Sequence, residues 1–386
     1  MQIDCKYKKE CSGCQYLDLS LQEQQHLKTQ ALSGLLRDFK IPFKSAINLT
    51  SLGPAWLRDR VDLVFNSVGT EGVLGLYKKN SREILDIEQC QQLSPQLQAW
   101  LSEIRKIHWP IRKGSLRLRV GPQRQKGIWL DFANIDIKNL LEEKTILSNL
   151  LNCAVVEIGQ KHKVLQFVNG RLKLKDAEPQ VWFQSFIETQ AVDLFCSIGN
   201  FTQTGIQANR DLTKVISQWL EEIHSQHILE FGSGIGNLSF PALGYARKLT
   251  ACEIDRGALA GFEKTLQKLS QVPGFEKIRE RVEIQQGDFQ NRNPQKFAEY
   301  DTVLVNPPRS GLKEFLNPLI TETKKPKYFL YMSCFPESFV LDGQRLQQAG
   351  YSLQKLNIVD QFPQTTHYEI LSLWGLNEEK KVSGHK

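Results

Sequence analysis

The stretch Ile228-Leu229-Glu230-Phe231-Gly232-Ser233-Gly234-Ile235-Gly236-Asn237 decides the fold class of this chain. An apolar run ends in an acid, three glycines follow at alternate positions, and the apolar periodicity resumes at Leu238. This order predicts a strand, a tight loop and the start of a helix. Glycines allow the backbone to approach a ligand closely, and we expect the acid at the strand tip, Glu230, to take a positively charged or hydroxyl group of the ligand. The stretch is typical of a loop that binds a nucleotide cofactor.

A second acid supports this interpretation. Glu253 ends the next apolar run, 23 residues after Glu230, a spacing that fits a carboxylate that binds a ribose. Either NAD or S-adenosylmethionine could bind at such a loop. Glu230, together with the lack of a further glycine at the start of the helix, favours the non-phosphorylated ligand, S-adenosylmethionine. A similar stretch at 193–201 has Ser197 in place of a glycine, and we do not expect it to bind the cofactor.

The C-terminal half alternates between strand and helix patterns. Strands are predicted at 228–231, 249–254, 282–285, 302–305 and 328–332 with helical segments between them, which indicates a parallel α/β sheet. Two final apolar runs, 353–359 and 368–373, have no helix between them, so the last strand can lie antiparallel. The earlier half has the mixed pattern of an α+β domain. We predict two domains, 1–183 and 184–386.

Composition narrows the class of protein. The 386 residues are 41% hydrophobic and 24% charged, which is ordinary for a soluble globular chain. No run approaches the roughly 20 apolar residues of a membrane span, and the N-terminus lacks the apolar core of a signal peptide. We expect a cytoplasmic protein without a membrane partner, and no protein partner is evident.

The net charge of +7 says little, but its distribution is uneven. Residues 104–130 contain no acid, and they combine basic side chains with two tryptophans: Arg105, Lys106, Arg112, Lys113, Arg117, Arg119, Arg124, Lys126, Trp109 and Trp129. Such a segment suits a polyanion with stacked bases, and we expect it to contact RNA. The alternative is a pair of strands with a solvated basic face.

Eight cysteines in a cytoplasmic chain are not expected to form a disulfide framework. Cys153, Cys196 and Cys252 lie in apolar runs and are expected in the core. Cys5, Cys11 and Cys14 form a C-x5-C-x2-C pattern, and Cys90 follows a predicted hairpin. From spacing alone, these four thiols suit either zinc or an iron-sulfur cluster.

The last cysteine, Cys334, follows the fifth predicted strand, and Glu369 begins the final one. In an open α/β sheet both positions lie at the edge where ligands bind. Uracil C5 is too poor a nucleophile to attack a sulfonium methyl group, but addition of a thiolate at C6 generates an enolate at C5. A base must then remove the C5 proton. Cys334 is our candidate nucleophile and Glu369 our candidate base.

With these residues the chain resembles the RNA uracil-C5 methyltransferase family over nearly its full length, and within it the branch that acts on 23S rRNA and has no N-terminal TRAM domain. The matching motifs are the four spaced cysteines, Phe201-Thr202-Gln203, the glycine loop, Asn306-Pro307-Pro308-Arg309-Ser310-Gly311, Ser333-Cys334 and Asp360 to Glu369. The resemblance implies a class I S-adenosylmethionine-dependent methyltransferase domain of Rossmann-like α/β fold, preceded by an α+β domain that binds RNA and an iron-sulfur cluster.

The resemblance also assigns residues. It places Gln203, Gly232, Asn237, Glu253 and Asn306 at the S-adenosylmethionine site, Cys334 at the nucleophile and Glu369 at the base. Cys5, Cys11, Cys14 and Cys90 fall on the ligands of a 4Fe-4S cluster, and Arg58 on an arginine that faces RNA. The expected product is 5-methyluridine, with rRNA as substrate and tRNA as the alternative.

The sequence departs from the family pattern at three positions. Gly232 replaces an aromatic residue, and Phe335 and Gly205 each replace an asparagine usual in the family.

Three alternative functions compete with this prediction. An amino-methyltransferase would carry an aromatic residue at the position of Arg309, and a cytosine-C5 methyltransferase would carry a further cysteine within 306–311; neither residue is present. A non-catalytic RNA-binding iron-sulfur protein with a relic methyltransferase fold is the third.

Overall fold

The C-terminal half of the chain is built on an eight-stranded sheet. The computed structural model describes residues 3–68, 71–159, 163–288 and 297–377. The sheet has the order β1-β17-β18-β16-β15-β12-β13-β14. Its strands are β1 (Asn48–Ser51), β12 (His227–Phe231), β13 (Lys248–Glu253), β14 (Val282–Gln286), β15 (Thr302–Val305), β16 (Tyr328–Ser333), β17 (Tyr351–Asp360) and β18 (Glu369–Leu376).

The five predicted parallel strands are confirmed, and so is the reversed last strand. β14, β13, β12, β15 and β16 pair in parallel, whereas β18 lies antiparallel between β16 and β17. All carboxyl ends of the parallel strands therefore meet at one edge, and the start of β18 reaches that same edge.

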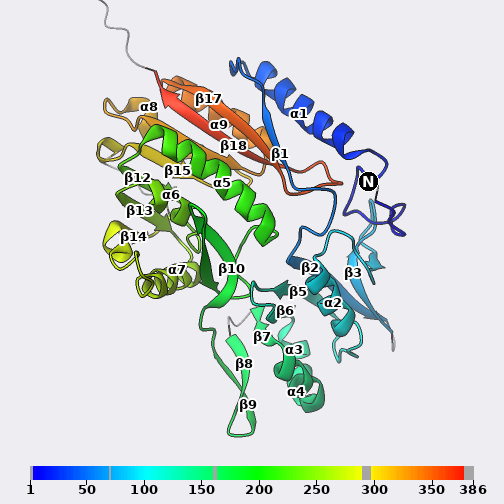
Figure 1. Ribbon diagram of the computed structural model, residues 1–386. Coiled ribbons are helices and arrows are strands. Elements are labelled where there is room, and N and C mark those ends of the chain that lie inside the picture. Colours follow the sequence, from blue (N-terminus) through cyan, green and yellow to red (C-terminus); the bar gives the residue numbers. More distant parts are fainter. Residues whose placement is uncertain (1–2, 69–70, 160–162, 289–296, 378–386) are drawn as a thin grey trace, which may run out of the picture.

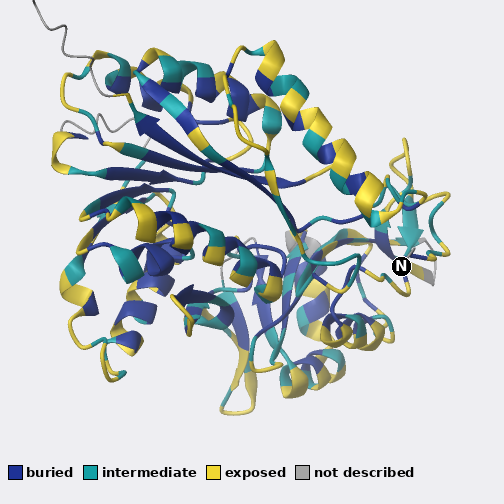
Figure 2. Cartoon of the chain, turned by 45° about the horizontal axis from the view of Figure 1, so that its top comes forward, coloured by how far each residue is buried: buried dark blue, intermediate teal, exposed yellow. Residues whose placement is uncertain are grey.

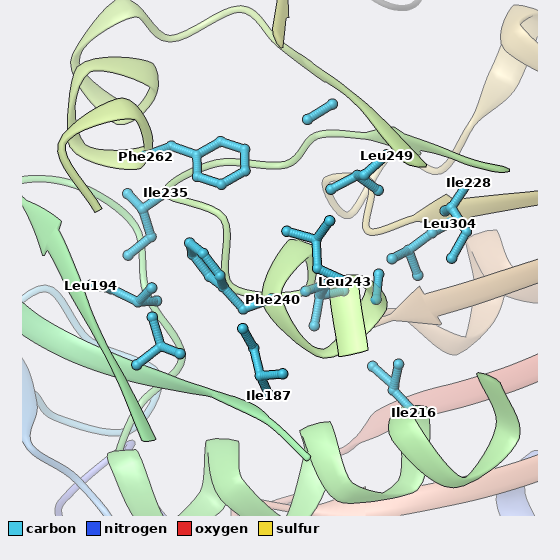
Figure 3. Packing of buried hydrophobic residues seen from close by; sticks show 14 of the residues in the cluster. Ile187, Leu194, Ile216, Ile228, Ile235, Phe240, Leu243, Leu249, Phe262 and Leu304 are labelled. Carbon is cyan, nitrogen blue, oxygen red and sulfur yellow. The ribbon is translucent and has the colours of Figure 1, made fainter. Parts of the chain in front are cut away.

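Helices cover both faces of this sheet (Figure 1). Successive strand residues point to opposite faces, so Ile228 packs with α5, α6 and α7 while Leu229 packs with α1, α8 and α9. Figure 3 shows the core that contains Ile228. In it the rings of Phe240 and Phe262 pack edge to face, with their centroids 5.5 Å apart. The helices are α1 (Leu21–Asp38), α5 (Ile206–Ile223), α6 (Ser239–Tyr245), α7 (Arg256–Leu269), α8 (Asn317–Thr321) and α9 (Pro336–Gln348).

Residues 21–51, which our sequence division counts with the first domain, pack on this C-terminal sheet. Helix α1 begins with a capping box formed by Ser20 and Glu23 and lies against α9. Strand β1, which the sequence analysis missed, pairs in parallel with β17. A four-residue strand at a sheet edge carries too short an apolar pattern to be recognised, and only its distant partner stabilises it.

A buried ion pair fastens α1 to the end of β17. Lys28 Nζ donates to Asp360 Oδ1 at 2.6 Å and to the Phe362 carbonyl at 3.1 Å, and the two charged side chains are 0% and 1% exposed. Burial lowers the pKa of Lys28 and raises that of Asp360. The α1 helix is thereby held to the segment that leads to Glu369.

The N-terminal lobe contains a second eight-stranded sheet, in the order β4-β3-β2-β5-β6-β7-β8-β9. Helices α2, α3 and α4 contribute to its core with Leu97, Ile137 and Leu147. The helical stretch 134–153 is divided at Glu143 into α3 and α4. The elements are β2 (Arg60–Val68), β3 (Glu71–Tyr77), β4 (Ile84–Asp86), α2 (Pro95–Ile104), β5 (Lys113–Val120), β6 (Lys126–Phe132), α3 (Asn134–Glu142), α4 (Lys144–Cys153), β7 (Val155–Ile158), β8 (Lys163–Val168) and β9 (Arg171–Asp176).

A separate antiparallel hairpin follows this lobe along the chain. It consists of β10 (Gln180–Ile187) and β11 (Gln190–Cys196), and it packs against α5, α6 and α7. The rejected glycine loop at 193–201 begins inside β11, so it does not follow a strand of the parallel sheet.

Burial follows the two sheets. Figure 2 shows buried residues along the central strands and exposed ones on the outer helix surfaces. Cys196 and Cys252 are buried as predicted, but the prediction for Cys153 is wrong because this residue ends α4 at an exposed position. Among the described residues, no helix has the length and apolar character needed to cross a membrane.

Candidate active site

The glycine loop after β12 lies against the end of β13. The amides of Gly232 and Ser233 donate to the Cys252 carbonyl at 2.9 and 3.2 Å. Gly232, Gly234 and Gly236 have φ values of 70°, 56° and 89°, a region that favours glycine. At Gly236 an added Cβ would lie 2.5 Å from Phe262, so only glycine fits this turn.

Glu253 closes the loop from the neighbouring strand. Its Oε2 accepts from the Gly234 amide at 2.8 Å, and its Oε1 accepts from the amides of Ile254 and Asp255 at 2.7 and 2.8 Å. The carboxylate is thus fixed at the strand tip, with lone pairs left for a hydroxyl donor. This is the place that the sequence analysis predicts for a ribose-binding acid.

Glu230 does not face a ligand. Its side chain is 2% exposed and accepts from Ser239 Oγ at 2.5 Å, at the start of α6. Burial raises its pKa to about 8. The expectation that this acid takes a cofactor group is therefore wrong for the described conformation, in which Glu230 holds the helix N-terminus.

The remaining predicted cofactor residues come from three different elements. Asn237 follows the glycine loop, and its amide exchanges two hydrogen bonds with Asn209 of α5 at 2.7 and 2.8 Å. Asn306 is half-buried at the tip of β15, and its carbonyl oxygen lies 3.3 Å from where a Cβ on Gly232 would be. Gln203 lies in the loop before α5 and is 4% exposed.

Cys334 and Glu369 come together across two neighbouring strands. Ser333, the last residue of β16, pairs with Ile370 of β18, so Cys334 and Glu369 lie at the same end of this strand pair. Cys334 is half-buried and Glu369 is 4% exposed. Burial and the Glu369 charge raise the pKa of the Cys334 thiol, and burial raises the pKa of Glu369 to about 8.

Two residues near this pair were not singled out from the sequence as functional. Arg309 is exposed in the loop after β15. Its positive charge opposes the rise in the pKa of both Cys334 and Glu369 that burial causes. Gln361 is 1% exposed and donates to Glu369 Oε1 at 3.1 Å. Both lie in motifs that the sequence analysis quoted, and their place at strand ends was the available signal.

The two other family departures have local surroundings that the structure describes. A Cβ on Gly205 would lie 1.9 Å from the Leu57 carbonyl oxygen, so the close approach of these two segments requires glycine here. Phe335 is 37% exposed and precedes α9, directly after Cys334.

The four N-terminal cysteines line one cavity of about 170 Å³. It lies between residues 5–14 and the Cys90 loop, and Leu17, Val61 and Ile87 contribute to its wall. All four cysteines are free thiols. Burial and the neighbouring thiols raise the pKa of Cys14 to about 12. Across the described residues, no three His, Cys, Asp or Glu side chains are grouped tightly enough to hold a single ion.

The basic segment 104–130 is largely engaged within the protein. Arg119 is 1% exposed and donates to Thr202 Oγ1 at 2.7 Å and to the Asn200 carbonyl at 3.1 Å. Arg117 pairs with Asp62 at 2.6 Å. Trp109 is 7% exposed and packs in the core. The prediction that these three side chains face RNA is wrong for Arg119 and Trp109, because burial excludes contact with a phosphate or a base.

Four basic side chains of that segment remain exposed, namely Lys106, Arg112, Lys113 and Arg124. Two further arginines lie over aromatic rings near the site. Arg58 is 5.7 Å from the ring of Phe362, and Arg60 is 5.6 Å from the ring of Phe201, which is 68% exposed.

The strand order, the glycine loop and the acid after the second strand together define a class I methyltransferase. A family model described as tRNA (Uracil-5-)-methyltransferase matches residues 196–374. An uncharacterized RNA methyltransferase of Bdellovibrio bacteriovorus is 47% identical over 380 residues, covering 98% of this chain and 96% of that protein. The chain belongs to the RNA (uracil-5-)-methyltransferase family.

More distant relatives also match nearly the whole chain. The 23S rRNA (uracil(1939)-C(5))-methyltransferase RlmD of Histophilus somni is 26% identical, covering 97% of this chain and 82% of that protein. Among solved structures, the tRNA (uracil-54, C5)-methyltransferase of Pyrococcus abyssi in complex with S-adenosyl-L-homocysteine superimposes with a TM-score of 0.66 at 18% identity, covering 94% of this chain and 86% of that one. At this identity the match shows a shared fold.

Proposed function

We propose that this protein transfers a methyl group from S-adenosylmethionine to C5 of a uridine in RNA, with 23S rRNA as its substrate. The observation that carries the proposal is that Cys334 and Glu369 lie close enough to interact electrostatically, at the sheet edge that also holds the glycine loop. The family supports the reaction class. The RlmD relatives, which match nearly the whole chain, favour rRNA over tRNA.

The reaction begins with addition of the Cys334 thiolate to uracil C6, which moves electron density to C5. Bound S-adenosylmethionine supplies an electrophilic methyl group. Once C5 carries that methyl group, Glu369 removes the C5 proton, the C5–C6 double bond re-forms, and the C6–S bond breaks to release the Cys334 thiolate. The raised pKa of Glu369, about 8, makes its carboxylate a stronger base than an exposed glutamate.

The residues present fit the cofactor. The positive-φ glycines leave the loop backbone open to close approach, and Glu253 offers a fixed carboxylate for hydroxyl groups. Gln203, Gly232, Asn237 and Asn306 are the other residues that would hold S-adenosylmethionine. We infer that Glu253 takes the ribose and that the loop amides lie beside the amino acid part.

The four N-terminal thiols surround one cavity. Four cysteine thiolates can hold either one zinc ion or an iron-sulfur cluster, and we choose the cluster because of the resemblance of the chain to its family. Cys5, Cys11, Cys14 and Cys90 would hold a 4Fe-4S cluster, and the Gly13 amide, 3.3 Å from Cys11 Sγ, supplies a hydrogen bond to one ligand.

Two substitutions test the covalent mechanism. Replacing Cys334 by Ala removes the nucleophile, so methyl transfer should be abolished while S-adenosylmethionine binding stays intact. Replacing Glu369 by Gln removes the base, so methylated RNA should remain attached to the protein through denaturation. Methyl transfer by the Cys334→Ala variant above a few per cent of the normal rate would contradict the mechanism.

Substrate and cluster need separate measurements. Mapping of 5-methyluridine in total RNA from cells lacking the gene should show loss from 23S rRNA, and loss from tRNA instead would reverse our preference. Protein purified without oxygen should be brown with about four irons per chain. Colourless protein with one zinc would exclude the cluster.

A further inference from the structure

A buried amide lies between the candidate base and the loop that carries Gln203. Gln361 follows the last residue of β17 and is 1% exposed. Its Nε2 donates to Glu369 Oε1 at 3.1 Å and to Gln203 Oε1 at 2.8 Å. Its Oε1 accepts a hydrogen bond from Thr204 Oγ1 at 3.4 Å. A single side chain therefore connects three residues from two distant parts of the sequence.

The chemistry of these groups sets their orientation. An ionised carboxylate only accepts hydrogen bonds, so Gln361 must turn its NH2 group toward Glu369. That group has two hydrogens, and the second goes to Gln203. Gln203 must then present its side-chain carbonyl oxygen to Gln361. The NH2 group of Gln203 therefore points away from Gln361.

The second oxygen of Glu369 is left free. Glu369 Oε2 is buried without a hydrogen-bond partner in the described part of the chain. An unpaired buried carboxylate oxygen is costly unless a proton or a donor arrives during function. Because Oε1 already accepts from Gln361, Oε2 is the oxygen on which no hydrogen bond competes with an incoming proton.

We propose that Gln361 is a positioning residue that holds Glu369 by Oε1, so that Oε2 receives the C5 proton, and that fixes the amide of Gln203 at the same time. The inference rests on the proposed function, since it assigns the step after methyl transfer. In that step the C5–H bond breaks, the proton goes to Oε2, the electron pair forms the C5–C6 double bond, and the C6–S bond breaks to return the thiolate to Cys334.

Other charged groups around the base act differently. Arg309 faces Glu369 from the loop after β15, and Cys334 faces it from the end of β16. Burial and the positive charges of Arg309, Lys28 and Arg58 lower the pKa of His367, two residues before the base. Arg309 acts on Glu369 through its charge, whereas Gln361 is the neutral group that fixes one named oxygen.

The test uses the full-length protein and follows decay of the covalent methylated RNA adduct. Gln361→Met keeps the volume of the side chain but gives no hydrogen bond. A hydrogen bond to a charged group contributes enough to change a rate or a proton equilibrium by about tenfold. We expect the adduct to persist about ten times longer, and the midpoint of its pH dependence to rise by about one unit, because the lost N–H donation stabilised the ionised carboxylate.

Two further variants make the result specific. Gln364→Met is the matched control, since Gln364 is a 2% exposed amide of the same loop whose side chain bonds Gln24 and not the base. It should leave adduct lifetime and pH midpoint unchanged. Gln361→Glu keeps the shape of the side chain and places a second carboxyl beside Glu369, so it should also raise the pH midpoint.

Two outcomes overturn the inference alone. In folded Gln361→Met and Gln361→Glu proteins, a normal adduct lifetime and pH midpoint, with Glu369→Gln still trapping the adduct, would show that Gln361 does not position the base. An equal slowing in Gln364→Met would assign the effect to loop packing. Absence of any adduct in Glu369→Gln, with methyl transfer by Cys334→Ala, would instead remove the proposed function itself.

Discussion

Replacement of Lys28 by Met should loosen the contact between α1 and the segment before Glu369. Both Lys28 and Asp360 are buried, at 0% and 1% side-chain exposure, so water cannot replace the lost ammonium group. Removing one partner of a buried ion pair leaves the other charge uncompensated, at a cost of about 3 to 5 kcal/mol. Asp360 Oδ2 has no hydrogen-bond partner in the described residues, and besides the backbone amide of Phe362 the carboxylate has Lys28 as its charged partner, through Oδ1.

The assay is amide hydrogen exchange under native conditions. A loss of about 3 kcal/mol corresponds to roughly a hundredfold faster exchange for amides that open with α1, since about 1.4 kcal/mol is tenfold. The matched control is Lys28→Met combined with Asp360→Asn, which removes the buried charge and should recover much of the protection. Equal exchange in the single and double variants would refute the reasoning, because the loss would then come from packing and not from an unpaired carboxylate.

Three further predictions concern the base, the RNA surface and the cofactor loop. Decay of the methylated adduct should accelerate as pH rises through about 8, because only deprotonated Glu369 accepts the C5 proton; a rate that falls over that range would contradict Glu369 as the base. Replacing Arg112 and Lys113 by Gln should reduce the slope of RNA affinity against salt by about 1.5 if both contact phosphates; an unchanged slope would move the RNA surface toward Arg58 and Arg60. Gly236→Ala should weaken S-adenosylmethionine binding, since its Cβ would lie 2.5 Å from Phe262 at a φ of 89°, and unchanged affinity in calorimetry would show that the loop adjusts.

The sequence predicted the parallel sheet well because four of its strands, β12, β13, β15 and β16, carry a buried apolar run. The tips of such strands are where ligands bind. The sequence also placed Cys334 and Glu369 at one edge of the sheet. Cys334 follows the carboxyl end of a parallel strand, and Glu369 begins a strand that runs in the opposite direction, so both lie at the same edge. It could not show that Glu230 turns inward to Ser239, because an acid at a strand tip has the same sequence signature whether it faces a ligand or a helix N-terminus.

The prediction that Arg119 contacts RNA was wrong for a similar reason. Alternation along β5 places Arg117 and Arg119 among apolar residues, and only the tertiary structure brings the loop carbonyls of Ser197 and Asn200 within reach of Arg119. A buried arginine with oxygen partners looks in sequence like an exposed one. Gln361 was missed because its importance depends on the side chains of Gln203 and Glu369, which are distant in the sequence.

The pairing of β1 with β17 has a consequence for how the chain is made. Asn48 lies beside Asn357, so the early strand waits for a partner that is synthesised some 300 residues later. At about 5 to 20 residues per second, that delay is roughly 15 to 60 s. During this time the apolar stripe of α1, with Leu32 and Leu36, has no native surface to cover it. The N-terminal segment therefore exposes apolar surface throughout synthesis, although it ends as part of the sheet that completes last.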